Sequence, residues 1–535
     1  MAKVNDYDVV LVGGGHNGLT CAGYLARQGL SVAVLEKRDM VGGAASTQEF
    51  YPGFRATTWS FVVGLLEPKV IEDLELRKYG FELISRAHGA FMPEKDGPGF
   101  IMPKTLEESV TAIREFSEHD AKAYRRFDAD VTEAALFLKK QVLKTPPNIS
   151  GGFSELFKLL PVVKELYGIS SEKAQLLVNL FSMSVGDFLD GYFETDALKG
   201  SQAFGAMTGQ YLSPYAPGTA YGLLHHAWGT TDGVQGKFNL CKGGMGGITQ
   251  AMARSAEAYG ADIRVSAGVQ EVLVHKGRAT GVLLEDGTTV SGRVVVSNLN
   301  PRLLFGKLVD EALVPEEFSR RMSSWRCRSG SFRMNVALDK LPDFNGRPGI
   351  EQQDHHTCSM FFSPSLQYCE EAYLTAQTQG YSENPIMDIT IPSTLDDSLA
   401  PPGKHVATIF VQHVAPELPN GRSWDSEKEK VADHVLAVLD QYAGNFSSSV
   451  IAREIWSPAD LERELGMVGG DIFHGSLSLD QIYSFRPAAG YADYRTPIKA
   501  LYMCGSGTHP GGGVTGAPGH NAAREIIEDL RKKRI

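Results

Sequence analysis

Two hydrophobic patterns alternate along this chain. Continuous apolar runs at 7–12, 31–35 and 500–504 predict buried strands, and a glycine turn and a helix over about 18–28 separate the first two. Between about 106 and 201, apolar residues recur at every third or fourth position, which predicts helices at 107–116, 121–139 and 172–181. The chain is therefore expected to begin as a parallel α/β unit and to continue into a mainly helical insertion.

Strand patterns return after the helical insertion. A helix after 247 precedes predicted strands at 262–265, 271–275, 279–284 and 293–297, whose turns suit an antiparallel addition. A third region, about 306–487, mixes strands at 331–338, 387–391 and 407–414 with a helix near 427–442. It is followed by a glycine-dense loop over 505–519 and a last helix over about 521–533. The pattern indicates a discontinuous α/β domain with a second, mixed-sheet domain inserted into it.

Composition and charge narrow the classes of partner. The 535 residues are 43% hydrophobic and carry a formal net charge of −11, which disfavours binding to nucleic-acid phosphates. No run reaches the ~20 apolar residues of a spanning helix, and the first strand begins too early to leave room for a targeting signal. We therefore expect a cytoplasmic protein whose membrane contact, if any, is peripheral. Six scattered cysteines lack a CxxC pair, which predicts buried, reduced thiols and no metal site.

A glycine motif carries the strongest chemical signal. Gly13, Gly15 and Gly18 form a GxGxxG between a strand and a helix, where backbone N–H groups meet a pyrophosphate. Glu36 closes the second strand about twenty residues on, where a carboxylate accepts the ribose hydroxyls. The pair Gly42-Gly43 then favours FAD over NAD. Taken separately, the glycines would also suit a plain turn, and Glu36 would suit a solvated charge at the end of a strand.

With these motifs the chain resembles the phytoene desaturase and retinol saturase superfamily of flavin amine-oxidase-like folds. The resemblance rests on the segments at 12–18, 42–43, 243–247, 295–298 and 501–513. Within the superfamily, the segments at 470–475 and 492–497 look closest to the pyridine nucleotide-disulfide oxidoreductase domain-containing protein 2 group. Ala44 stands where relatives that act on carotenoids often carry arginine, and this difference weakens a direct transfer of carotenoid desaturation.

The resemblance implies a Rossmann-type FAD-binding domain over 1–95, 235–305 and 488–535, and an α+β substrate domain over 96–234 and 306–487. The residues expected to bind FAD are Gly13, Gly15, His16, Asn17, Gly18, Glu36, Lys37, Gly42, Gly43, Ala44, Val269, Gly505, Val514 and Thr515. The loop around Gly505 is not read as a second nucleotide site, because neither a βαβ unit nor an acidic strand end follows it. Instead, the amino end of the last helix is expected to face the flavin.

Three histidines are candidates for catalysis. His509 lies in the loop expected beside the flavin, and a bond to the backbone is its alternative role. His474 and the pair His225-His226 are candidates to line a substrate cavity, with His226 the one we select. An amphipathic run over 153–169 is a candidate for docking on lipid or at a channel mouth; a dimer contact or a core helix is its alternative.

These features favour an FAD-dependent dehydrogenase or oxidase that transfers hydride from a hydrophobic small molecule to flavin N5. The enzymatic rivals are a redox-neutral isomerase or saturase and an amine oxidase. A rival of another class is a non-catalytic escort protein, against which the intact glycine motif and Glu36 argue.

Overall fold

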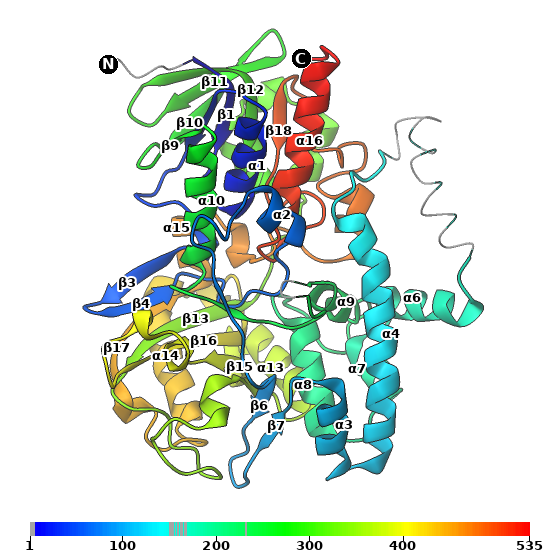
Figure 1. Ribbon diagram of the computed structural model, residues 1–535, viewed down its shortest axis with the longest axis vertical. Coiled ribbons are helices and arrows are strands. Elements are labelled where there is room, and N and C mark those ends of the chain that lie inside the picture. Colours follow the sequence, from blue (N-terminus) through cyan, green and yellow to red (C-terminus); the bar gives the residue numbers. More distant parts are fainter. Residues whose placement is uncertain are drawn as a thin grey trace.

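Two seven-stranded sheets organise the molecule (Figure 1). The computed structural model describes residues 6–148, 168–230 and 233–535, together with 155, 157, 160 and 164. The sheet nearer the two chain ends carries the glycine motif, and the other sheet lies at the opposite end of the molecule. The long helix α4 (Glu118–Val142) runs along the unit of the second sheet, and its carboxyl end reaches the unit that carries the chain ends.

The first sheet is assembled from three separated stretches of the chain. Its order is β10 (Val269–His275), β11 (Arg278–Leu284), β12 (Thr289–Ser297), β1 (Asp6–Val12), β2 (Val32–Leu35) and β9 (Asp262–Arg264), and β18 (Leu501–Met503) also pairs with β12. The pairs that β1 forms with β2 and β12 are parallel, as are those of β9 and β18. Helices α1 (His16–Arg27), α10 (Gly246–Ala258) and α16 (Ala517–Arg531) accompany this sheet. The predicted α/β class with a discontinuous Rossmann-type domain is confirmed.

The second sheet is mixed and buried on both faces. Its order is β17 (Val450–Trp456), β13 (Ser331–Leu338), β16 (His405–Val414), β15 (Tyr381–Thr390), β14 (Ser359–Phe362), β6 (Ala90–Met92) and β7 (Phe100–Met102). One face packs against α14 (Trp424–Leu439) through apolar side chains such as Met334 and Ile409. The opposite face carries several polar side chains. Although β6 lies within the range that we assigned to the FAD-binding domain, it extends this second sheet by pairing with β14.

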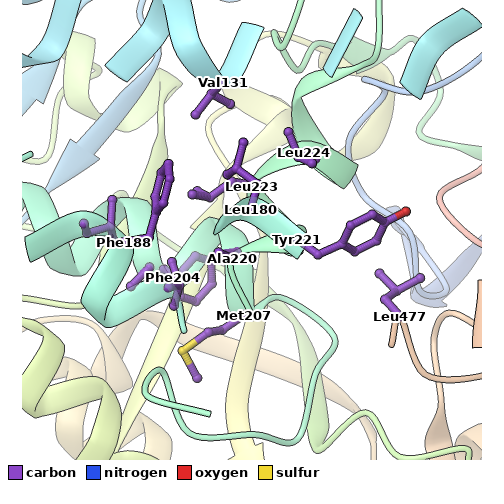
Figure 2. Close-up of a cluster of buried hydrophobic side chains, with 14 of the residues drawn as sticks. Val131, Leu180, Phe188, Phe204, Met207, Ala220, Tyr221, Leu223, Leu224 and Leu477 are labelled. Atoms are coloured by element: carbon purple, nitrogen blue, oxygen red, sulfur yellow. The ribbon is translucent and has the colours of Figure 1, made fainter. Parts of the chain in front are cut away.

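Short helices form an apolar wall beside the second sheet. They are α3 (Leu106–Arg114), α6 (Ser171–Ser182), α7 (Val185–Asp190), α8 (Asp196–Met207) and α9 (Tyr221–Ala227). Figure 2 shows Leu180, Phe188, Phe204 and Leu223 gathered in one apolar cluster, with Tyr221 at its edge. The amphipathic run predicted over 153–169 lies largely outside the described residues.

Some element boundaries differ from the sequence prediction. α16 begins at Ala517, four residues earlier than predicted, because Thr515 Oγ1 accepts the Ala517 N–H and Pro518 suits a first helical turn. All six cysteines are buried and free. Among the described helices, none has the length and apolar character needed to cross a membrane.

Candidate active site

The glycine turn after β1 brings backbone close to backbone. Gly13 has a φ of +95°, and a Cβ on Gly18 would lie 2.3 Å from the Gly13 carbonyl oxygen. Gly15 is the residue before the first turn of α1. Because no side chain caps α1, the free N–H groups at its amino end favour an anion.

Glu36 lies where the ribose of a dinucleotide is expected. Its carboxylate is 8% exposed and accepts the N–H of Gly14 at 2.8 Å and the N–H of Arg38 at 2.9 Å. A carboxylate offers about four lone pairs, so two remain for ribose hydroxyls. The Ala267 N–H donates to the Glu36 carbonyl at 2.8 Å, which places the segment leading to Val269 beside this strand end. The Lys37 ammonium is turned to Glu285, 3.1 Å away, and is mostly exposed.

The second glycine pair lies directly against the first turn. The Gly42 N–H donates to the Gly14 carbonyl at 2.9 Å, and Gly42 has a φ of +120°. Its Cβ would lie 2.7 Å from Thr249 Oγ1, so a side chain has no room there. The carbonyl of Ala44 accepts the N–H groups of the segment at 59–60. The chain is thereby held in a narrow path past the amino end of α1.

The tail of the chain returns to the same place. A Cβ on Gly519 would lie 2.2 Å from the carbonyl of Asn17, so α16 packs tightly on α1. The amide nitrogen of Asn17 donates to Ser506 Oγ at 3.1 Å. A Cβ on Gly505 would lie 2.5 Å from the Asn298 carbonyl. The structure therefore brings together the three stretches expected to hold FAD.

These residues fit FAD on independent grounds. His16 Nε2 and Asn17 Oδ1 are buried without a hydrogen-bond partner, although buried polar atoms are almost always paired. Both belong to the first turn of α1, where a pyrophosphate is expected. The spare acceptors of Glu36 and the backbone N–H groups of the glycine turn would supply the remaining contacts. The contacts of the individual residues stay predictions.

Three histidines are partly accessible, although burial perturbs their pKa values. His16, His226 and His474 keep part of their surface accessible. Yet burial lowers the pKa of His16 to about 3 and that of His474 to about 4, and it also lowers the pKa of His226. Their imidazoles are neutral at pH 7, and His226 Nδ1 lies 2.9 Å from the Gly222 carbonyl.

His509 is placed differently from the other candidates. Its Nε2 lies 3.0 Å from the Gln141 carbonyl, so this nitrogen carries the proton and donates it. The side chain is buried, which lowers the pKa of His509 to about 4. The hydroxyl of Tyr494 donates to the His509 carbonyl at 2.9 Å. His509 therefore takes the alternative role left open by the sequence, a hydrogen bond to the backbone. This bond connects the end of α4 to the flavin loop.

The sequence analysis missed Arg486 and Asp471. The fully buried guanidinium of Arg486 donates to the carbonyls of Phe473 at 2.6 Å and Ser506 at 2.7 Å. Asp471 accepts the N–H groups of Phe473 and Gly475 and thereby closes the turn that holds His474 at a φ of +57°. Arg486 therefore joins the His474 turn to the flavin loop. No spacing rule identifies such an arginine, because its acceptors are backbone carbonyls brought together only by folding.

His225 was set aside in favour of its neighbour His226, yet it also faces the flavin loop. Its Nε2 is buried without a partner and lies 3.5 Å from the position that a Cβ on Gly513 would take. The ring packs edge to face on Phe473, with the ring centroids 5.1 Å apart.

Known families and proteins match nearly the whole chain. Residues 104–527 match the family described as flavin containing amine oxidoreductase, and residues 11–62 match the NAD(P)-binding Rossmann-like domain. The rat protein named pyridine nucleotide-disulfide oxidoreductase domain-containing protein 2 is 37% identical, with 98% of this chain and 94% of that protein covered. A limonene dehydrogenase component of Castellaniella defragrans is 26% identical, over 99% of this chain and 96% of its own.

More distant matches lie in the predicted superfamily. The lycopene-forming phytoene desaturase of Pantoea ananas is 25% identical, over 97% of this chain and 99% of that protein. A solved putrescine oxidase with bound putrescine superposes with a TM-score of 0.61 at 17% identity, covering 98% of this chain and 99% of that one. That structural likeness concerns the fold alone.

Proposed function

Since the chain belongs to the flavin-containing amine oxidoreductase family, we propose that it is an FAD-dependent dehydrogenase or oxidase that removes hydride from a carbon of a hydrophobic substrate. Its cofactor is FAD, as the family implies. The bound flavin supplies a hydride acceptor at N5. The reaction and the hydrophobic class of the substrate are the proposal.

The observation that carries this proposal is a set of partly accessible apolar side chains near the glycine turn, which we propose line the substrate cavity. Phe61, Phe361 and Ile472 are partly accessible and pack against the large apolar cluster of the helical wall. The backbone of the segment before Phe61 hydrogen-bonds to Ala44, directly after the glycine pair. The apolar lining therefore begins where the cofactor segment ends.

The residues of this chain would act mainly by positioning. Aromatic side chains hold an apolar substrate and exclude water, and a well-aligned C–H bond accounts for most of the rate in such chemistry. The neutral imidazoles of His226 and His474 are partly accessible and would be available to orient a polar group. The amino end of α16 is expected to stabilise negative charge on the reduced ring. His509, bonded to the Gln141 carbonyl, is better suited to hold the flavin loop than to move a proton.

The names of two relatives support a hydrophobic substrate. Limonene and phytoene are hydrocarbons, and the proteins named for them match this chain over nearly its full length. Ala44 in place of arginine argues against copying the carotenoid substrate itself. We propose the broader class of apolar molecules of cavity size.

An anaerobic half-reaction tests the proposal. The purified protein is mixed without oxygen with a panel of terpenes, fatty compounds and amines, and the oxidised flavin spectrum is followed. Bleaching by an apolar compound is the expected result. Product formation without bleaching would instead establish an isomerase or saturase, and bleaching by amines alone would establish an amine oxidase. A protein purified without FAD that does not take it up would be an escort protein, and the proposal would be wrong.

Peripheral membrane contact is a further part of the proposal. Phe157 and Leu160 are 65% and 54% exposed, and such side chains suit lipid more than water. Cosedimentation with liposomes tests this contact. The cytoplasmic location and a homodimer stay predictions.

A further inference from the structure

The face of the second sheet that looks away from α14 carries a polar cluster. By strand register, Arg333 of β13, Phe410 of β16 and Asp388 of β15 lie in one row across the sheet. Thr390 lies in the next row of the same face. Arg86 reaches this face, where its Nη1 donates to Ser359 Oγ at 2.6 Å. We call Arg86, Arg333, Asp388 and Thr390 the floor cluster.

Arg333 is a buried cation whose donors are largely unused. Its side chain has no exposed surface. Only Nη2 donates, to Asn335 Oδ1 at 3.3 Å and Thr408 Oγ1 at 3.1 Å, and both acceptors are neutral. Nε and Nη1 have no partner, and the described residues place no carboxylate in ion-pair contact with this guanidinium. The rings of Trp59 and Phe61 lie 5.9 and 5.2 Å from its central carbon.

The other members of the floor cluster also have buried polar atoms without a hydrogen-bond partner. Nε and Nη2 of Arg86, Oδ1 of Asp388 and Oγ1 of Thr390 are buried without a partner. Both guanidinium groups are near enough to Asp388 to oppose the rise of its pKa to about 7 that burial causes. The Glu454 carboxylate is near enough to stabilise the charge of Arg333, but its two oxygens accept from Gln48 at 2.7 Å and Asn335 at 2.8 Å and not from this guanidinium. Four guanidinium nitrogens are therefore without an acceptor, against one unpartnered carboxylate oxygen.

A buried arrangement of this kind requires an acceptor. A buried donor without a partner lowers stability, because it has lost its hydrogen bonds to water without replacement. Asp388 and Glu454 offset much of the positive charge, but neither accepts a hydrogen bond from Arg333 Nε or Nη1, so these two donors remain for an oxyanion. Phe61 lies against Arg333 and belongs to the partly accessible apolar side chains of the proposed substrate cavity, so the missing acceptor is expected to enter from that side.

We propose that the floor cluster binds the carboxylate of the substrate, with Arg333 as the principal ligand, so that the substrate class is a hydrophobic carboxylic acid. This inference rests on the proposed function, in which the cavity receives an apolar substrate. Phe61 and Trp59 would move aside to admit the carboxylate, because Arg333 has no exposed surface without such a movement. The carboxylate is held at the sheet, and the apolar chain extends through the cavity towards the flavin.

Binding to the resting holoprotein tests the inference without turnover. Dodecanoate, octanoate, the two matching alcohols and dodecyl phosphate are titrated by calorimetry. We expect the carboxylates to bind at least about tenfold more tightly than the alcohols, a difference of about 1.4 kcal/mol. Arg333→Met should abolish this preference. Arg126→Met, which removes an exposed arginine that also lies over a ring, should retain it.

The remaining outcomes are decisive. Failure of every carboxylate to bind, equal affinity for acid and alcohol, or an unchanged preference in Arg333→Met would overturn the inference. Tighter binding of dodecyl phosphate would overturn the carboxylate class. If Arg333→Met does not retain FAD, the nearly isosteric variant Asp388→Asn provides the test. Removal of the competing negative charge should strengthen dodecanoate binding severalfold, and an unchanged affinity would contradict the proposal. Selective carboxylate binding by a protein whose flavin no apolar compound bleaches would refute the proposed function alone.

Discussion

Replacement of Glu36 by glutamine tests how FAD is held. The carboxylate uses two lone pairs on the N–H groups of Gly14 and Arg38, so two remain for ribose hydroxyls. An amide keeps one oxygen and presents an NH₂ donor in place of the other, so it cannot serve both the backbone and the ribose. Hydrogen bonds to a charged acceptor are worth about 1.5–3 kcal/mol. We therefore expect the Kd for FAD to rise by about 10- to 150-fold.

The assay must separate cofactor affinity from folding. Apoprotein of the wild type and of Glu36→Gln is titrated with FAD by fluorescence quenching, and urea unfolding is measured without FAD. The unfolding free energy should fall by about 1–3 kcal/mol, because one backbone N–H loses its acceptor. Glu257→Gln, an exposed change on α10, should alter neither quantity. A folded Glu36→Gln protein that binds FAD within twofold of the wild type would refute the assignment.

Three further predictions follow from contacts near the same site. Gly18→Ala should lower the unfolding free energy by about 1–3 kcal/mol and reduce the FAD content, because its Cβ would lie 2.3 Å from the Gly13 carbonyl oxygen. Gly306→Ala is the control, because the space beside Gly306 is open and neither quantity should change. A Gly18→Ala protein with unchanged stability and FAD content would contradict the tight packing. Arg486→Met should lower the free energy of unfolding by about 3–5 kcal/mol and reduce the FAD content, and Arg486→Lys should be intermediate in both. Unchanged FAD content in Arg486→Met would show that the loops do not depend on this side chain. Burial lowers the pKa of His509 to about 4 against 6.5 in the unfolded chain, so between these pH values only the unfolded chain gains the proton and stability falls on acidification. From pH 7 to pH 5 the wild type should therefore lose about 2 kcal/mol more than His509→Gln in urea unfolding, and parallel losses would count against a buried neutral His509.

Local patterns were sufficient for much of the first domain. The run ending at Val12, the glycines at 13, 15 and 18 and the acidic end of β2 are within one βαβ unit, where short-range geometry decides the structure. The predicted strand at 331–338 agrees with β13 because alternate positions face two different buried environments. Helix starts were less accurate, since the start of α16 depends on Thr515 and Pro518 in its own loop.

The sequence by itself determined the nucleotide-binding turn, the parallel unit around it and the class of flavoprotein. Only the tertiary structure decided which polar groups are left without partners. Arg333 and Asp388 are far apart in the chain and share a row of the sheet only through the pairing of β13, β16 and β15. The role of His509 likewise depends on the Gln141 carbonyl at the end of a distant helix. Burial and hydrogen bonding are properties of the assembled core, and no local spacing along the chain encodes them.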